Sequence, residues 1–144
     1  MKTVAQLLTS KQKQNLYTIA PESTVDEALS LMALRNIGAL PVVEAGRLTG
    51  IVSERDYVRK VSRHGHSAND LQVADIMSSP VITVAPRQTI RECMALFTDR
   101  YLRHLPVVDE GRLIGLLSIG DIVKSMVAEQ EQLIEQLEQY IRGH

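Results

Sequence analysis

Cysteine, tryptophan and phenylalanine are scarce in this chain, and each scarcity excludes something. The single cysteine, Cys93, cannot form a disulfide within the chain, and one thiol cannot build a cysteine metal cluster. With no tryptophan, one phenylalanine and four tyrosines, the core has to be filled by aliphatic side chains and methionine. No apolar run approaches the roughly 18 residues that span a bilayer, and the N-terminal residues show no signal-peptide pattern. We therefore expect a soluble, cytoplasmic protein.

Net charge is also small. Lys and Arg number 16 and Asp and Glu number 17, which leaves a formal charge of −1. No broad basic field is available to attract a nucleic acid or an anionic membrane. The length of 144 residues, 44% of them hydrophobic, suits one domain or two small halves that share a core.

Internal repetition is what the chain has in abundance. The segment Leu40-Pro-Val-Val-Glu-Ala-Gly-Arg-Leu-Thr-Gly-Ile-Val-Ser-Glu-Arg-Asp56 recurs 65 positions later as Leu105-Pro-Val-Val-Asp-Glu-Gly-Arg-Leu-Ile-Gly-Leu-Leu-Ser-Ile-Gly-Asp121. Upstream positions recur at the same offset without a gap: Thr18, Pro21, Thr24 and Glu27 match Thr83, Pro86, Thr89 and Glu92. An internal repeat has to be interpreted first, because it determines the architecture.

Each repeat predicts the order strand, helix, strand, strand, helix. Leu16–Ile19 is the first strand, a helix with apolar residues at 3–4 spacing follows Thr24, and a glycine turn at 44–47 joins two short apolar strands. A half of this size cannot easily bury its own sheet. We therefore expect an α/β (α+β) fold in which two β-α-β-β-α repeats pack around a pseudo-twofold axis. The boundaries are 1–62 for repeat 1, 63–72 for the linker, 73–128 for repeat 2, and 129–144 for a C-terminal helical extension.

The C-terminal segment predicts one long helix, because Asp121–Arg142 contains no Gly or Pro. Its apolar residues follow a 3–4 spacing that only Gln130 interrupts: Val123, Met126, Leu133, Leu137 and Tyr140. This stripe could pack on its own module, or it could pair with the same helix of a second copy. The first repeat has no counterpart to the extension, which favours pairing in a homodimer.

The strand ends carry the candidate chemistry. In each repeat an apolar strand ends at a serine, Ser53 or Ser118, and an aspartate, Asp56 or Asp121, opens the next helix. A helix start attracts anions through its free N–H groups, a hydroxyl can donate to phosphate, and a carboxylate can hold a ribose diol. An aspartate at a helix start is often only a cap, so that alternative stays open.

These motifs resemble a tandem pair of CBS domains, the module named after cystathionine β-synthase. The resemblance covers the chain from about Val4 to about Val127 and is carried by Leu40–Val43 with Gly50–Asp56 and by His104–Asp109 with Gly115–Asp121. The chain is similar to the small stand-alone bacterial CBS-domain proteins. The resemblance implies a signal-transduction module, such as an energy sensor, that binds AMP, ADP, ATP, NAD or S-adenosylmethionine in two clefts between the repeats.

The resemblance also implies the site residues. Asp56 and Asp121 hold ribose, Asp56 faces Arg103-His104, and Asp121 faces Gly38-Ala39. The implied nucleotide-binding set is Asp121, Ser118, Arg103, His104, Ile37, Gly38, Ala39, Asp56, Ser53, Arg55, Leu102, Val81, Ile82, Leu16 and Tyr17. Within this set, Leu16-Tyr17 and Val81-Ile82 supply backbone to the adenine.

The two clefts are not expected to be equal. Arg103-His104 stands where the first repeat has Gly38-Ala39, and Glu54-Arg55 stands where the second has Ile119-Gly120. Arg55, with Arg59 and Lys60 behind it, could reach phosphates from the first helix start. We expect both clefts to bind adenine nucleotides, with different affinities and different preferences for phosphate length.

Other functions are weighed against this one. An enzyme is disfavoured because no acid–base pair is repeated, and because Cys93 takes the place of Ala28 in a helix, where a small core residue is expected. No catalytic cofactor is expected. A metal site at His64 and His66 is disfavoured because no third ligand lies near them in the sequence.

Two alternatives remain open. The basic run Arg55, Arg59, Lys60 and Arg63 would suit a nucleic-acid-binding CBS pair, although such a run is usually a solvated helix face. The module could also be a structural dimerisation unit that binds no ligand. An unidentified regulated protein is a further possible partner, and no membrane contact is expected.

Overall fold

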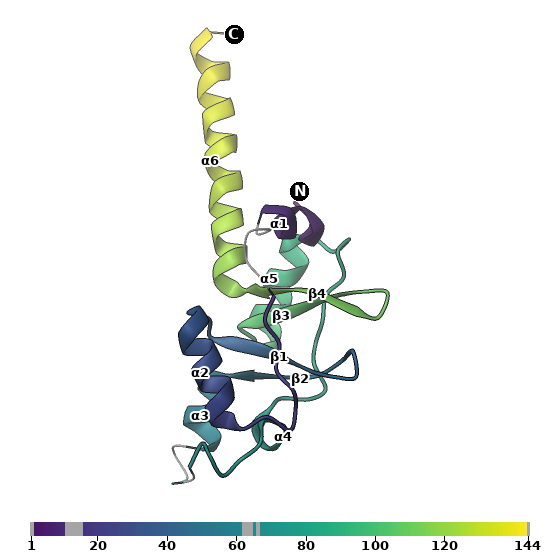
Figure 1. Cartoon of the computed structure of the whole chain (residues 1–144). Helices are drawn as coiled ribbons and strands as arrows, with labels where there is room; N and C mark the ends of the chain where they lie inside the picture. The colour runs from purple at the N-terminus through teal and green to yellow at the C-terminus, as the bar shows by residue number, and fades with distance from the viewer. Residues whose placement is uncertain (1, 11–15, 62–64, 66, 144) are drawn as a thin grey trace.

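The computed structural model describes residues 2–10, 16–61, 65 and 67–143, and within them it contains six helices and four strands (Figure 1). Their order is α1 (Val4–Ser10), α2 (Val25–Arg35), β1 (Ala39–Glu44), β2 (Arg47–Ser53), α3 (Glu54–Lys60), α4 (Val73–Ile76), α5 (Ile90–Arg100), β3 (His104–Asp109), β4 (Arg112–Ser118) and α6 (Ile119–Gly143). The predicted fold class is confirmed: two similar α+β halves and a long C-terminal helix.

Each half contains one antiparallel hairpin, and the two hairpins have the same register. Strand β1 pairs with β2 and β3 pairs with β4, each with an irregularity between two consecutive valines, Val42/Val43 and Val107/Val108. The turn residues Ala45 and Gly46 have φ values of 50° and 80°, and Glu110 and Gly111 have 50° and 78°. Two central residues with positive φ match the twist of a tight hairpin, so the predicted glycine turn is confirmed in both repeats.

The predicted first strand is much shorter than expected. Instead of a strand over 16–19, only Ile19 pairs with Val42 in a parallel bridge, and Val84 pairs with Val107 in the same way. Prolines explain the short ladder, because proline has no N–H to donate. The next rung on one side would need an N–H at Pro41, and the next rung on the other side would need one at Pro21.

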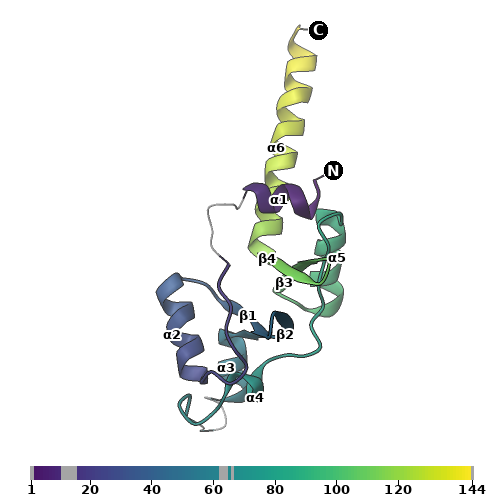
Figure 2. The same cartoon turned by 45° about the vertical axis from the view of Figure 1, so that its right-hand side comes forward.

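Each hydrophobic core is completed by a helix that precedes the other repeat in the sequence. Val4 and Leu7 of α1 are buried in the core of the second half, and Val73 and Ile76 of α4 are buried in the core of the first. In Figures 1 and 2, α1 accordingly lies beside α5, and α4 lies beside α3.

Equivalent backbone hydrogen bonds hold the two exchanged helices. The N–H groups of Val4 and Val73 donate to the carbonyls of Gln88 and Ser23, both at 2.8 Å. The two halves are thus connected by backbone hydrogen bonds as well as by apolar contacts.

The long predicted helix is present as α6, 25 residues in one piece. Its first turns pack on the second half, where Ile122 and Ser125 are buried. From Val127 to Gly143 every residue is exposed, and both views show the helix projecting away from the body (Figures 1 and 2). Among the helices of the described segments, none combines the length and the apolarity needed to cross a membrane.

A glycine in each second strand makes room for an exchanged segment, and this generates a stability prediction. A Cβ on Gly50 would lie 2.5 Å from Sδ of Met77 and 3.0 Å from the backbone oxygen of Ser78, whereas one on Gly115 would meet only the Leu8 side chain, at 2.6 Å. A side-chain end can move aside, but the Ser78 carbonyl is fixed by its bridge to Ile51. We expect Gly50→Ala to lower the free energy of unfolding by about 1–3 kcal/mol.

Gly115→Ala is the matched control for this substitution. It should cost less, because Leu8 can rotate away and because alanine lowers the entropy of the unfolded chain. Urea denaturation of both variants measures the difference, and an equal loss would contradict this account of the Gly50 position.

Candidate functional site

The hairpin register brings the start of one strand next to the end of its partner. Ala39 pairs with Ser53 at the end of β2, and His104 pairs with Ser118 at the end of β4. Helices α3 and α6 begin immediately after these serines. Each repeat therefore gathers its Ser-x-x-Asp motif and the residues before its Leu-Pro-Val-Val strand at one place.

In both motifs the serine and the aspartate cap the helix reciprocally. Ser53 N donates to Oδ2 of Asp56 at 2.8 Å and Asp56 N donates to Oγ of Ser53 at 3.2 Å; the matching bonds of Ser118 and Asp121 measure 2.8 and 3.1 Å. The helices thus begin two residues before the predicted Asp56 and Asp121, and the cap interpretation of these aspartates is confirmed. A carboxylate offers about four lone-pair sites, so a cap alone does not exhaust its capacity to accept hydrogen bonds.

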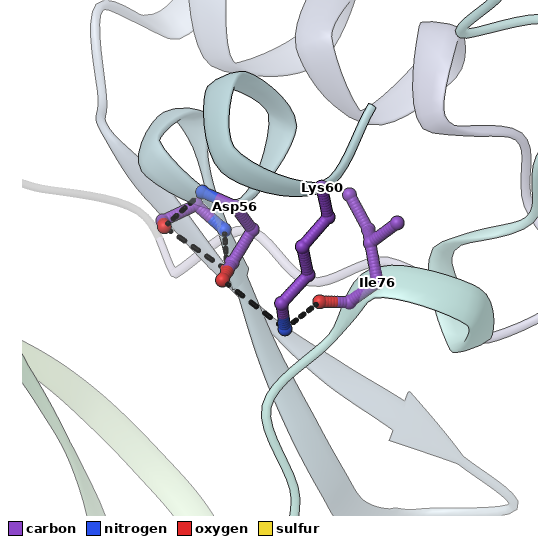
Figure 3. Close-up of polar contacts among 4 residues, drawn as sticks. Asp56, Lys60 and Ile76 are labelled. Carbon is purple, nitrogen blue, oxygen red and sulfur yellow. Dashed lines mark hydrogen bonds and ion pairs between the residues drawn. The ribbon is translucent and has the colours of Figure 1, made fainter. Parts of the chain in front are cut away.

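Lys60 places a cation between Asp56 of the first motif and the end of α4. Its Nζ lies 3.7 Å from Oδ1 of Asp56 and donates to the carbonyl oxygen of Ile76 at 2.8 Å (Figure 3). The Asp56 side chain is 15% exposed and the Lys60 side chain 45%. Lys60 is therefore tied to Asp56 and to α4, which limits its freedom to reach a phosphate.

A cavity of about 320 Å³, here called the Asp56 cleft, opens at the first motif. Both repeats line it: Gly38, Ala39, Ile51, Ser53, Glu54, Arg55, Asp56, Arg59, Ser78, Tyr101, Leu102, Arg103 and His104. The structure thus brings Asp56 together with Arg103-His104. Its volume falls at the lower end of the 300–1,000 Å³ that small-molecule sites occupy.

A second cavity of about 250 Å³, the Asp121 cleft, opens at the second motif. It is lined by Asn36, Ile37, Gly38, Ala39, His104, Leu116, Ser118 and Asp121. Asp121 therefore shares this cavity with Gly38-Ala39. Gly38, Ala39 and His104 line both cavities, so the two clefts have a common wall.

Positive charge is concentrated in the Asp56 cleft. The Arg103 guanidinium lowers the pKa of Arg55, Arg59 and a slight desolvation lower it further, and Asp56 acts in the opposite direction. Arginine nonetheless stays charged at any physiological pH. Like charges from both repeats thus line this cleft, an arrangement that an anion would relieve.

The Asp121 cleft lacks this charge. Gly38 stands at the position equivalent to Arg103, and Gly120 at the position equivalent to Arg55. The Asp56 cleft also contains opposing charge, since Glu54 lines it near Gly38 and adds a second carboxylate to that of Asp56. The difference between the clefts therefore lies mainly in the guanidinium groups.

Four of the candidate residues do not reach either cleft. Tyr17 packs against the first core with the Arg35 guanidinium 4.7 Å from its ring centre, and Leu16 is 39% exposed. Ile82 packs against the second core, and Val81 lines a separate cavity near the hairpin turns. These segments are displaced because they approach the sheets only at the single bridges of Ile19 and Val84.

Sequence reasoning missed six lining residues, one of them Glu54 of the Asp56 cleft. Tyr101 and Ile51 line the Asp56 cleft, and their equivalents 65 positions away, Asn36 and Leu116, line the Asp121 cleft. Asn36 and Tyr101 both end a helix with φ of 55°. The signal that could have found these four residues is the offset of 65 residues, which relates Asn36 to Tyr101 and Ile51 to Leu116. Ser78 has no such signal.

Cys93 is a core residue. It is buried completely within α5, and burial raises the pKa of its thiol to about 11. At neutral pH the thiol is protonated and is a poor nucleophile. His64, His66 and Arg63 lie outside the described residues.

Comparison with known proteins identifies the family. The model of the CBS domain matches residues 4–63 and again 73–128. The chain therefore belongs to the CBS-domain family and carries a tandem pair, a regulatory module.

Individual relatives agree. CBS domain-containing protein CBSX3, mitochondrial, of Arabidopsis thaliana is 37% identical over 98% of this chain and 72% of its own length. A solved structure of a protein with CBS domains from Burkholderia ambifaria is 47% identical, with a TM-score of 0.85 over 90% of this chain and 96% of that one. The structure of CBSX2 in complex with AMP is 26% identical, with a TM-score of 0.73 over 90% and 99% of the two chains.

The burial of Cys93 predicts an unreactive thiol. In the native chain at neutral pH, a disulfide reagent such as dithionitrobenzoate should react with Cys93 far more slowly than in the guanidinium-unfolded chain, because the thiol is buried and its pKa is about 11. The release of nitrothiobenzoate measures both rates. Equally fast labelling of native and unfolded chains would revive Cys93 as a candidate nucleophile.

Proposed function

We propose that the chain acts in the cytoplasm as a non-enzymatic regulatory module that binds adenine nucleotides in its two clefts. Occupancy of the clefts would alter how the two repeats sit against each other, and a regulated partner would sense that change. The module would also form a homodimer through its helices.

The observation that carries the proposal is the composition of the Asp56 cleft. One cavity combines a carboxylate, Asp56, with guanidinium groups from both repeats, Arg55 and Arg103. A carboxylate can accept hydrogen bonds from a ribose diol, and guanidinium groups pair with phosphate. Apolar and aromatic side chains in the same cavity, including Leu102 and Tyr101, can contact a base.

Volume and charge together support the Asp56 cleft as the tighter site. It is larger than the Asp121 cleft, about 320 Å³ against about 250 Å³, and holds the guanidinium groups that the other lacks. AMP in the related CBSX2 structure supports adenine nucleotides as the ligand class. The Asp121 cleft, with Ser118 and Asp121 but no arginine in its lining, suits a ligand with fewer phosphates.

Calorimetry of the full chain with AMP, ADP, ATP and NAD tests the binding. We expect at least one of the four to bind, and Asp56→Asn to weaken the tighter site about tenfold or more, because hydrogen bonds to a charged group contribute about 1.5–3 kcal/mol. Asparagine is preferred to alanine, because Asp56 also caps α3. The amide oxygen can keep that cap while the charge is lost.

Asp75→Asn is the matched control. Asp75 accepts a hydrogen bond from Gln72 N at 2.8 Å in the capping box of α4, but it lines neither cleft. It should leave nucleotide affinity unchanged. No binding of any of the four at millimolar concentration would refute the proposal, and binding of nucleic acid that weakens steeply with salt would favour the alternative function.

Arg103→Ala should change which nucleotide the Asp56 cleft prefers. Loss of one guanidinium should reduce ATP affinity about tenfold more than AMP affinity, because the longer phosphate chain makes more charge-assisted contacts. Arg112→Ala, which removes an exposed arginine from a hairpin turn, is the control. Titrations at two salt concentrations measure the ratio, and equal losses for both nucleotides would place Arg103 away from the phosphates.

A further inference from the structure

The outer part of α6 presents an apolar stripe that the rest of the described chain does not cover. Every residue from Val127 to Gly143 is exposed, yet this segment includes five large apolar side chains that are half to four-fifths exposed: Leu133 56%, Ile134 56%, Leu137 53%, Tyr140 70% and Ile141 81%. An isolated helix of this length is only marginally stable in water. Some partner is therefore needed to account for a stable projecting helix.

The stripe has the spacing of a helix that packs along another helix. Written as heptads, Val123, Gln130 and Leu137 fall at position a, Met126, Leu133 and Tyr140 at d, and Val127, Ile134 and Ile141 at e. Val123 and Val127, on the half of α6 that packs against the body, are still 45% and 47% exposed. The face is thus open from Val123 to Ile141 except at Met126, which packs partly against the second core, and Gln130 is its one polar member.

The chain's own body cannot cover this face, because the helix leads away from it in both views (Figures 1 and 2). An anionic membrane is also a poor match. The polar flanks of the outer helix carry Glu129, Glu131, Glu135 and Glu138 against a single Arg142. The partner should therefore be a protein helix whose own apolar stripe is of similar length.

A second copy of α6 in antiparallel orientation meets these requirements. Two identical stripes centred between Gln130 and Ile134 place Val123 opposite Ile141, Val127 opposite Leu137, and Gln130 opposite Ile134 of the other copy. The same face then serves both copies, as a twofold interface requires.

Charge decides the orientation. In the antiparallel pair, Lys124 of one copy lies at the same edge of the stripe as Glu138 of the other, a favourable contact that occurs twice, while Glu131 lies near Glu131 of the other copy, an unfavourable contact that occurs once. In a parallel pair, Glu129 of one copy would face Glu131 of the other on both sides of the stripe. We propose that the exposed stripe of α6 binds the α6 of a second copy of this chain in antiparallel orientation.

The first test is the mass of the full chain in sedimentation equilibrium. Ile134→Glu combined with Leu137→Glu should halve the mass of the assembly, because two carboxylates would be buried at the centre of the interface. The control, Gln132→Glu with Gln139→Glu, adds the same charge on the outward face and should leave the mass unchanged. A monomeric parent chain, or an assembly that survives the central substitutions, would overturn the proposal.

The second test distinguishes the two orientations. Because Cys93 is buried, the variants Val123→Cys and Ile141→Cys each add one accessible thiol. Under mild oxidation, a mixture of the two should give disulfides that join position 123 to position 141, identified by mass spectrometry of the peptides, while each variant alone should give few. Efficient 123–123 and 141–141 disulfides would show a parallel pair and overturn the antiparallel arrangement.

Discussion

Neither half of this chain can complete its own core, and the rest of the structure depends on how that deficit is met. Each small sheet receives a helix from the segment that precedes the other repeat: α1 contributes Val4 and Leu7 to the second core, and α4 contributes Val73 and Ile76 to the first. Gly50 and Gly115 leave the space that these segments occupy. Because each half is held by a piece of chain belonging to the other, the two halves are fixed face to face, and their strand ends meet at the junction where the clefts open.

At those strand ends, one side chain combines two roles that sequence reasoning sets against each other. Asp56 accepts hydrogen bonds from Ser53 and closes the first turn of α3, and it also lines the cavity opposite Arg103. A structural cap fixes the position and rotamer of the carboxylate. A fixed carboxylate loses little entropy on binding a ligand. The cap is therefore compatible with a binding role, and it prepares the side chain for one.

Much of this architecture could be predicted, because it depends on local patterns that the repeat doubles. The turns at Gly46 and Gly111 and the long α6 follow from short motifs and the constant offset, whereas the meeting of Asp56 with Arg103-His104 was implied by the resemblance to CBS domains. The first strand was predicted, but its reduction to a single bridge was not. The cause of that reduction, the missing N–H groups of Pro21 and Pro41, can be read in the sequence.

The exchange of α1 and α4 could not be predicted in the same way. An amphipathic turn shows that it needs an apolar surface, but its sequence does not say which of two similar surfaces it takes. The displacement of Leu16-Tyr17 and Val81-Ile82 from the clefts has a similar origin, since it depends on where each segment leaves its single bridge to the sheet.

The two clefts differ because the two repeats differ in a few charged residues. Because each cleft mixes both repeats, Arg55 from the first and Arg103 from the second meet in one cleft, while glycines, Gly120 and Gly38, occupy the equivalent positions of the opposite repeats. In the Asp56 cleft the charge of Arg103 repels that of Arg55, which lowers the pKa of Arg55. An anion bound between them would replace that repulsion with two attractions and draw the repeats together at this edge only. Under the proposed function, a ligand in the Asp121 cleft would have no such effect, so a change in repeat orientation would report mainly the occupancy of the Asp56 cleft.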